Sequence, residues 1–292
     1  MQISYVVVVA VVVSLVLAQV NQRLASPLLS IVDRWIRWLV FAFGGAEILR
    51  DFGWLDRPYP VLVVCCFILW FVGETLYNWL AISALSVSPF PLFPRYVANQ
   101  GGEGWPVQPR LLKIRDWLRS QDFQQIQALK AEIGGGIYLR VSVYQNVDAT
   151  LRIQITFLPQ ANGVPSACFS ITTLGEGDIR VVTDNLYIPF GGFYPESWLV
   201  ERSPWIRALP NLLTTHIKRL DRLHVRPVPF TVDPLADLNA AQNELDRVNT
   251  ELGFLHPHSE REDFGKITHE GRYRVWKEIW TLNYLGRSAK YH

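Results

Sequence analysis

A carboxyl and an amide group, on Glu74 and Asn78, lie within a long and mostly apolar run, 59–85. Their spacing of four residues places both side chains on one face of a helix. An ionisable group inside a membrane is costly and marks a functional site by default. Two other interpretations stay open: Glu74 lies near the membrane boundary, or it pairs with Arg37 or Asn78 where two helices meet.

The other residues that could act as nucleophiles or metal ligands have no suitable partners near them in the sequence. Cys168 is expected on the polar face of its strand and has no histidine near it in the sequence, so a nucleophilic role is disfavoured. His256 and His258 lack further ligands at metal-binding spacing. Cys65 and Cys66 are adjacent in the apolar run, where helix packing is favoured over lipidation or redox chemistry. We therefore predict no catalytic residue, no metal site and no cofactor.

Signature motifs of common enzyme classes are absent from the 292 residues. There is no G-x-S-x-G, H-E-x-x-H, P-loop or clustered C-x-x-C pattern. The formal net charge of +2 is too small to favour nucleic acid as a partner. The 3 cysteines offer no disulfide framework, which fits a reducing compartment. These observations favour a non-enzymatic protein.

Three apolar runs in the first third of the chain predict membrane-spanning helices, at about 3–20, 31–49 and 59–85. The first and third are long and apolar enough to cross a hydrocarbon core of roughly 30 Å. The second contains Asp33, Arg34 and Arg37, so it either spans with its arginines reaching outward or lies at the interface. No Lys or Arg precedes the first run, which favours a retained anchor over a cleaved signal peptide.

Arginines between the first and second runs set the predicted orientation. Arg23, Arg34 and Arg37 place that loop in the cytoplasm by the positive-inside rule. Three spans then put the soluble remainder in the cytoplasm, whereas two spans would put it outside. We expect a multi-pass membrane protein with a cytoplasmic domain.

The chain divides into four predicted parts. Residues 1–85 form the transmembrane region, and 86–110, rich in Pro and Gly, form a linker. Residues 111–226 form a soluble α+β domain, and 227–292 form a helical docking tail. The predicted fold class is thus a membrane-anchored α+β protein, in which helices flank a four-stranded antiparallel sheet.

Periodicity predicts the elements inside the soluble parts. Apolar residues spaced by three and four predict a helix over 111–133, either continuous or divided in two at Ser120 and Asp122, which the glycines 134–136 would end. A second amphipathic helix is predicted over 205–225, with Arg219 on its solvent side. Alternating patterns predict four strands, at 137–144, 151–157, 167–173 and 179–183. Two further helices are predicted, at 233–252 and 270–285.

Two aromatic segments are the candidate contact surfaces. The segment 189–198, PFGGFYPESW, either contacts a ligand or partner or packs on the sheet. The final helix, 270–285, either lies at the membrane interface or docks onto a protein surface. The candidate contact residues are Phe190, Gly191, Gly192, Phe193, Tyr194, Trp198, Tyr273, Trp276 and Trp280.

Two stretches, FSITTLGEGDIRVVTDN and GRYRVWKEIWTLNYLG, resemble segments of bacterial membrane-anchored proteins of no assigned function. The first pattern there is an aromatic strand, a Thr, an acidic-Gly turn and Thr-x-Asn. Its positions are filled here by Phe169, Thr172, Gly177, Thr183 and Asn185. The resemblance implies a bacterial membrane context and no particular activity.

These features together predict a non-enzymatic binding or scaffold subunit of a larger assembly in the bacterial inner membrane. Its partners would be the lipid bilayer and either other membrane-protein subunits or a second copy of the chain. One alternative is a membrane-tethered sensor that binds a small ligand in its α+β domain, under the segment 189–198. A third is a membrane-associated enzyme of unknown reaction.

Overall fold

A computed structural model describes residues 2–24, 26–53, 55–102, 104–159 and 165–288. The chain forms two compact units. The helical unit comprises Met1–Ser86, Pro189–Gly191 and Arg272–His292. The sheet unit comprises Val87–Ile188 and Gly192–Gly271.

Three long helices begin the helical unit: α1 (Gln2–Leu24), α2 (Pro27–Asp51) and α3 (Tyr59–Val87). Two stretches, Tyr5–Gln22 and Tyr59–Val87, are long and apolar enough to cross a membrane. Only 6% and 11% of these stretches are buried, so neither is enclosed by the rest of the chain as a core helix would be. α2 is one continuous helix of 25 residues.

Small residues on α2 allow close approach of its neighbours. A β-carbon at Gly44 would lie 3.2 Å from Val7 of α1, and one at Gly45 would lie 3.1 Å from the sulfur of Cys66 on α3. Ala42 and Ala46 are completely buried. Packing of helices through such small residues is typical of membrane proteins, where backbones approach closely.

The described residues of the sheet unit form eight strands in one sheet, and the first seven follow one another in chain order. Neighbouring strands are antiparallel except β6 and β7, which are parallel, and β8 pairs with β5. The strands are β1 (Tyr96–Ala98), β2 (Gln124–Gly134), β3 (Ile137–Gln145), β4 (Leu151–Leu158), β5 (Ser166–Gly175), β6 (Arg180–Asp184), β7 (Trp198–Arg202) and β8 (Pro227–Val228).

The prediction of a four-stranded sheet is wrong, because four additional strands join it: β2, β7 and β8 pair with predicted strands, and β1 pairs with β2. The largest addition is β2, which occupies residues predicted to continue a helix over 111–133. That helix, α4 (Pro109–Ser120), is short, and β2 pairs with β3 over nearly its whole length. β1 lies in the segment predicted to be a linker, and β8 lies in the segment predicted to be the tail. The boundaries predicted for the four parts of the chain are not tested by these pairings.

The glycines 134–136 form a hairpin turn rather than the predicted helix end. Gly134 pairs with Ile137, which leaves Gly135 and Gly136 as the two central residues. Their φ angles are 61° and 74°. The type I′ two-residue hairpin has positive φ at both central positions, which glycine adopts without steric cost.

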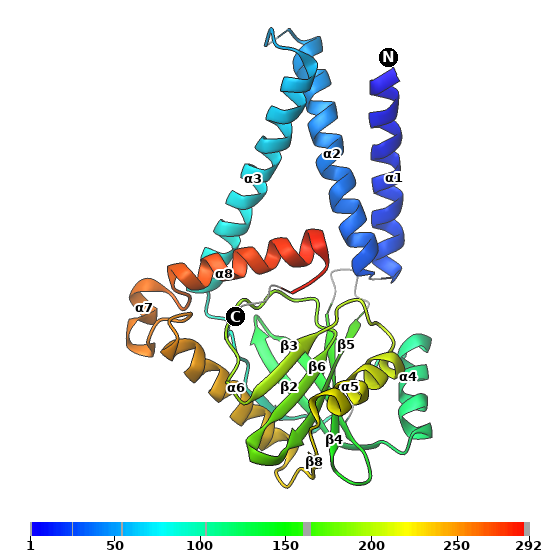
Figure 1. Ribbon diagram of the computed structural model, residues 1–292, viewed down its shortest axis with the longest axis vertical. Helices are drawn as coiled ribbons and strands as arrows, with labels where there is room; N and C mark the ends of the chain where they lie inside the picture. The colour runs from blue at the N-terminus through cyan, green and yellow to red at the C-terminus, as the bar shows by residue number, and fades with distance from the viewer. Residues whose placement is uncertain (1, 25, 54, 103, 160–164, 289–292) are drawn as a thin grey trace. The chain divides into compact units, whose positions relative to one another are not determined.

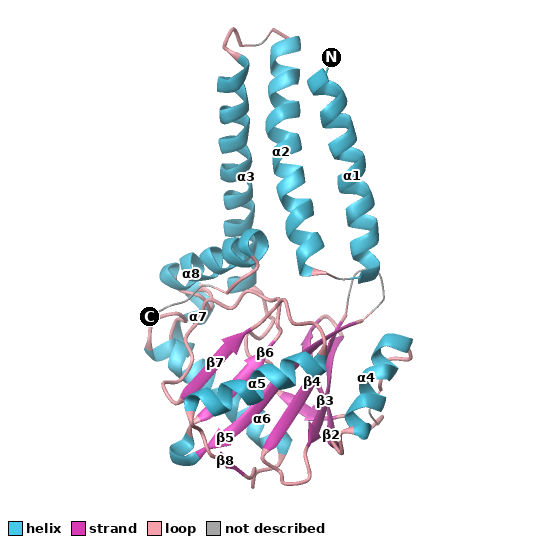
Figure 2. Ribbon diagram, turned by 45° about the vertical axis from the view of Figure 1, so that its right-hand side comes forward, coloured by secondary structure: helices cyan, strands magenta, loops and turns pink. Residues whose placement is uncertain are grey.

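Helices cover both faces of the sheet (Figure 2). α4 and α5 (Leu209–Leu223) pack on one face, over a core that includes Tyr144. α6 (Pro234–Glu251) packs near β1 and β2 on the other face, with Val143 beneath it. Since residues 143 and 144 alternate along β3, the two cores lie on opposite faces.

Two helices and a π-helical turn close the described part of the chain. A short α7 (Arg261–Phe264) precedes α8 (His269–Trp280), and a π-helical turn, Thr281–Leu285, follows α8. The predicted helices over 233–252 and 270–285 are therefore present as α6 and α8 with its π-helical turn. Asp233 caps α6 by accepting from the backbone N–H of Leu235 at 3.0 Å.

Candidate functional site

Glu74 of α3 is the centre of a polar cluster in the helical unit. One carboxylate oxygen accepts from Arg34 of α2 at 3.4 Å, and the other accepts from the indole of Trp70 at 3.0 Å. The hydroxyl of Tyr284, in the π-helical turn, donates to the same oxygen as Trp70. Both oxygens therefore have donors, and Arg34 balances the charge. Glu74 thus pairs with Arg34, not with the sequence candidates Arg37 or Asn78.

Aromatic rings fasten α8 to the helices α2 and α3. The ring centroid of Trp280 lies 5.7 Å from Trp38, 5.0 Å from Phe71 and 4.6 Å from Tyr284. Trp35 also donates its indole N–H to the carbonyl of Tyr284 at 3.1 Å. Such ring pairs contribute about 0.5–1.5 kcal/mol each beyond the area they bury. The chain's own helices therefore cover the Trp280 part of the aromatic face of the final helix.

The other charges of α2 are also paired within the helical unit. Asp33 accepts from Ser14 of α1 at 2.5 Å and pairs with Arg37 at 2.6 Å. Glu47 pairs with Arg50 at 2.5 Å. These contacts satisfy acidic groups whose isolated burial would be costly.

The first part of the segment 189–198 is anchored to α8. The carbonyl of Gly191 accepts from Arg274 Nε at 2.9 Å. A β-carbon at Gly191 would lie 2.8 Å from the backbone of Arg274 and Val275, and its φ is 70°. Both the backbone conformation and the close approach therefore require glycine at this position.

The second part of this segment is anchored to α6. Asn249, which is completely buried, accepts from the N–H of Phe193 at 2.7 Å and donates to its carbonyl at 2.9 Å. Trp198, on β7, lies under the guanidinium of Arg180 at 5.2 Å. Phe190 and Tyr194 are half-buried, and Gly192 is buried.

The two remaining candidates on α8 differ from Trp280. Tyr273 is 46% exposed and stacks on Trp276 at 5.7 Å. The nine candidate contact residues thus fall into separate environments, at α8, at α6 and at β7. Sequence reasoning missed Trp35, Trp38 and Tyr284, whose only local signal is their aromatic character.

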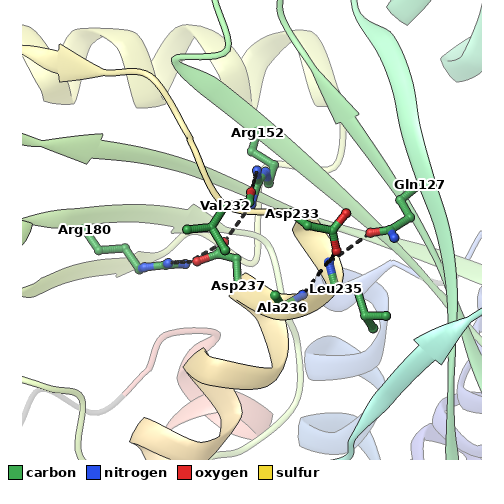
Figure 3. Close-up of polar contacts among 8 residues, drawn as sticks. All are labelled: Gln127, Arg152, Arg180, Val232, Asp233, Leu235, Ala236 and Asp237. Atoms are coloured by element: carbon green, nitrogen blue, oxygen red, sulfur yellow. Dashed lines mark hydrogen bonds and ion pairs between the residues drawn. The ribbon is translucent and has the colours of Figure 1, made fainter.

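A buried ion cluster fastens α6 to the sheet (Figure 3). The carboxylate of Asp237 lies between Arg152, at 2.8 Å, and Arg180. Arg152 also donates to the carbonyl of Val232 at 3.0 Å and stacks on Phe230 at 4.0 Å. Because the Asp237 carboxylate is occupied by two guanidinium groups, this cluster is a structural joint.

Three groups in the sheet unit have perturbed acidity: His216 and Asp184, which are buried, and Cys168, which is half-buried. His216 lies between Thr173, at 3.0 Å, and Thr183, at 2.9 Å, and burial lowers its pKa to about 4. Burial raises the pKa of the Cys168 thiol to about 11, which opposes formation of a nucleophilic thiolate. Burial also raises the pKa of Asp184 to about 6.

Arg219 was predicted on the solvent side of its helix, and that prediction is wrong. The side chain is buried and donates to the carbonyls of Val182, at 2.7 Å, and Leu199, at 2.9 Å. Its long polar side chain lies across the strands β6 and β7, because their carbonyl oxygens supply the acceptors that a buried guanidinium requires.

The two histidines of the HPH sequence pair with acids. His258 contacts Asp246 at 2.7 Å, and His256 lies 3.6 Å from Glu260. Across the described residues, no three His, Cys, Asp or Glu side chains are grouped as metal ligands would be.

Comparisons of the chain with models of known protein families, with curated proteins and with solved structures found no match. The resemblance of two segments to bacterial membrane-anchored proteins is therefore not supported by a family match.

Proposed function

We propose that the protein is an integral membrane protein held in the bilayer by its helical unit. The observation that carries this proposal is α3, whose 29 residues span about 43 Å at the usual rise per residue, more than a hydrocarbon core. Val64, Leu69 and Leu76 on this helix are each more than half exposed. Soluble proteins rarely expose such a continuous apolar surface, which supports a lipid environment.

α2 is proposed as a third span despite its charges. The pairing of Asp33 with Arg37 and of Glu47 with Arg50 supports this, since membrane interiors tolerate charges that are paired. Half-exposed arginines can also extend toward lipid headgroups. With three spans and Arg23 at the end of α1 that leads to α2, the N-terminus is outside and the sheet unit is cytoplasmic. The bacterial inner membrane is the location that the sequence resemblance favours.

The sheet unit is proposed as a non-enzymatic binding or scaffold module of a membrane assembly. The raised pKa of Cys168 and the enclosed ring of His216 both disfavour catalysis by these groups. The anchors at Gly191 and Phe193 oppose a mobile lid over a ligand. A scaffold is therefore preferred to a sensor, with another membrane subunit or a second copy as its partner.

Membrane fractionation of cells that express the full chain tests the first proposal. The protein should remain in the membrane pellet after an alkaline carbonate wash, and its release into the supernatant would contradict membrane spanning. Purification in mild detergent tests the scaffold role. We expect a partner at fixed stoichiometry or a defined oligomer, whereas a lone monomer would contradict it.

A further inference from the structure

The strand β7 lies at one edge of the sheet, and β6 is its only partner among the described strands (Figure 2). It has five residues, and each of them keeps part of its surface exposed. An edge strand presents a row of N–H and C=O groups with which another chain can pair. β7 is therefore a candidate surface for strand pairing.

Hydrogen bonds to β6 show which backbone groups of β7 face outward. The carbonyl of Ser197 and the N–H of Ser203 both bond to β6, at 2.9 and 2.7 Å. Because these directions alternate along a strand, the odd-numbered residues between them also face β6. The N–H and C=O of Val200, at the centre of β7, therefore point away from the sheet. Across the described residues, no hydrogen bond to either group is found.

The opposite edge of the sheet, at β1, is closed by a side chain. Asn239 of α6 accepts from the N–H of Tyr96 at 2.8 Å and donates to its carbonyl at 3.0 Å. A residue of a neighbouring strand would make the same two bonds, and β1 is only three residues long. No described side chain bonds to the backbone of Val200 in this way. Of the two edges, β7 is thus the one at which a further strand can pair.

The outward groups of β7 are complementary to those of a second β7 strand. In an antiparallel pair centred on Val200, this residue lies opposite Val200 of the second copy, and the two exchange both backbone bonds. Trp198 then lies opposite Arg202 of the second copy. The N–H of Trp198 already donates to the carbonyl of Pro195 at 2.9 Å, so only its carbonyl takes part.

Side-chain charges favour this register over its neighbours. Residues directly opposite each other share a face of the sheet, and here Leu199 lies opposite Glu201 of the second copy. Displacement by two residues in one direction would place Glu201 opposite Glu201, where like charges repel. Displacement in the other direction would leave Arg202 beyond the paired strand. The register centred on Val200 therefore pairs the whole strand without opposing like charges.

We propose that β7 pairs antiparallel with β7 of a second copy of this chain, so that one sheet continues through both copies. A second copy is favoured over an unrelated strand because β7 is complementary to itself about Val200. Two-fold pairing is also closed, since it uses the open edge of each copy and ends the assembly at a dimer. This inference rests on the scaffold role proposed above and names the surface through which the copies associate.

Sedimentation equilibrium of the full chain in mild detergent tests the pairing. The wild type should be a dimer. Val200→Pro removes an N–H that faces outward, so it spares the bonds to β6 and should raise the dimer dissociation constant at least about tenfold. Val200→Thr is the matched control, because it keeps both the N–H and the branched β-carbon, and it should dimerise as the wild type does.

Cross-linking in membranes gives a second measurement that does not depend on the folding of the proline variant. In a chain whose native cysteines are replaced by alanine, Val200→Cys should cross-link to its copy through a short bis-maleimide. The two positions face each other with Cα atoms about 5.5 Å apart in such a pair. Val97→Cys, on β1 and 52% exposed, should not cross-link.

A dimer that does not cross-link at position 200, or that survives Val200→Pro undiminished, would overturn the pairing and leave the scaffold role intact. A stoichiometric complex with a different subunit, without self-association, would have the same meaning. A lone monomeric chain would contradict both the pairing and the scaffold role.

Discussion

At the scale of single residues, the hydroxyl of Tyr284 links the C-terminal part of the chain to α3. It donates to Glu74, a residue 210 positions away, inside a cluster that also contains Arg34. Burial raises the pKa of Tyr284, so the hydroxyl stays protonated and available as a donor. In the sequence, Glu74 is a functional candidate only because it lies in an apolar run. Its contacts in the structure instead make it an anchor for the C-terminal part of the chain.

Replacement of Tyr284 by Phe removes one donor from the partly buried carboxylate of Glu74 and leaves the ring in place. We expect a loss of about 1–3 kcal/mol in the free energy of unfolding. Thermal unfolding in detergent measures the effect. Trp205→Phe, at an exposed position, should change stability by no more than about 0.5 kcal/mol. Equal midpoints for Tyr284→Phe and the wild type would show that Tyr284 does not anchor Glu74.

His216 and Asp184 predict opposing pH effects on the sheet unit. Folding lowers the pKa of His216 from 6.5 to about 4, so the folded state disfavours its protonation and stability rises with pH across that window. Folding raises the pKa of Asp184 from 3.8 to about 6, so stability falls as pH increases over that range. Each pKa shift changes the free energy of unfolding by about 3 kcal/mol across its pH window. Because the two changes have opposite signs, they nearly cancel in the wild type.

Single variants should therefore reveal the two slopes. In Asp184→Asn, stability should increase from pH 4 to 6.5, because only the His216 contribution remains. In His216→Leu, stability should decrease from pH 4 to 6, because only the Asp184 contribution remains. Chemical unfolding at a series of pH values measures both slopes. Parallel pH profiles for the two variants would refute the assignment.

At the scale of elements, β2 shows why part of the fold could not be predicted. Phe123, Ile126 and Leu129 are spaced by three, which resembles a helix. The register shifts between Gln125 and Gln127, so Ile126 lies at a β-bulge. The extra residue breaks the period of two and produces the helical spacing. Strands with unbroken alternation, such as β4, could be predicted from the sequence.

The joint between Gly191 and α8 provides a test at this scale. Gly191→Ala would place a β-carbon 2.8 Å from the α8 backbone and force alanine to a φ of 70°. We expect a loss of more than about 1–2 kcal/mol, which is the cost of the left-handed conformation alone. Thermal unfolding of the full chain gives the value.

Gly253→Ala separates the two contributions. Gly253 has a φ of 76° but nothing within 4 Å of its β-carbon position. This control should show the conformational cost without the clash, so it should be clearly less destabilised than Gly191→Ala. Equal losses for the two variants would mean that the segment does not approach α8 closely.

At the scale of the whole molecule, the sequence predicts the elements that depend on one continuous stretch of residues. The helices α1 and α3 follow from length and apolar composition, which are properties of one continuous stretch. The completion of the helical unit by the segment that begins at Arg272 depends on contacts between residues 189 to 249 positions apart, which periodicity does not encode. Trp35 and Trp38 carry no sequence signal that identifies Tyr284 as their partner.

Cysteine labelling in intact cells tests the central claim of three spans most directly. In a chain whose native cysteines are replaced by alanine, single cysteines are introduced at Gly53, between α2 and α3, and at Asn99, after α3. An impermeant maleimide should label position 53 in intact cells and position 99 only after lysis. Labelling of position 99 from outside, with position 53 protected, would contradict three spans and place the sheet unit outside the cell.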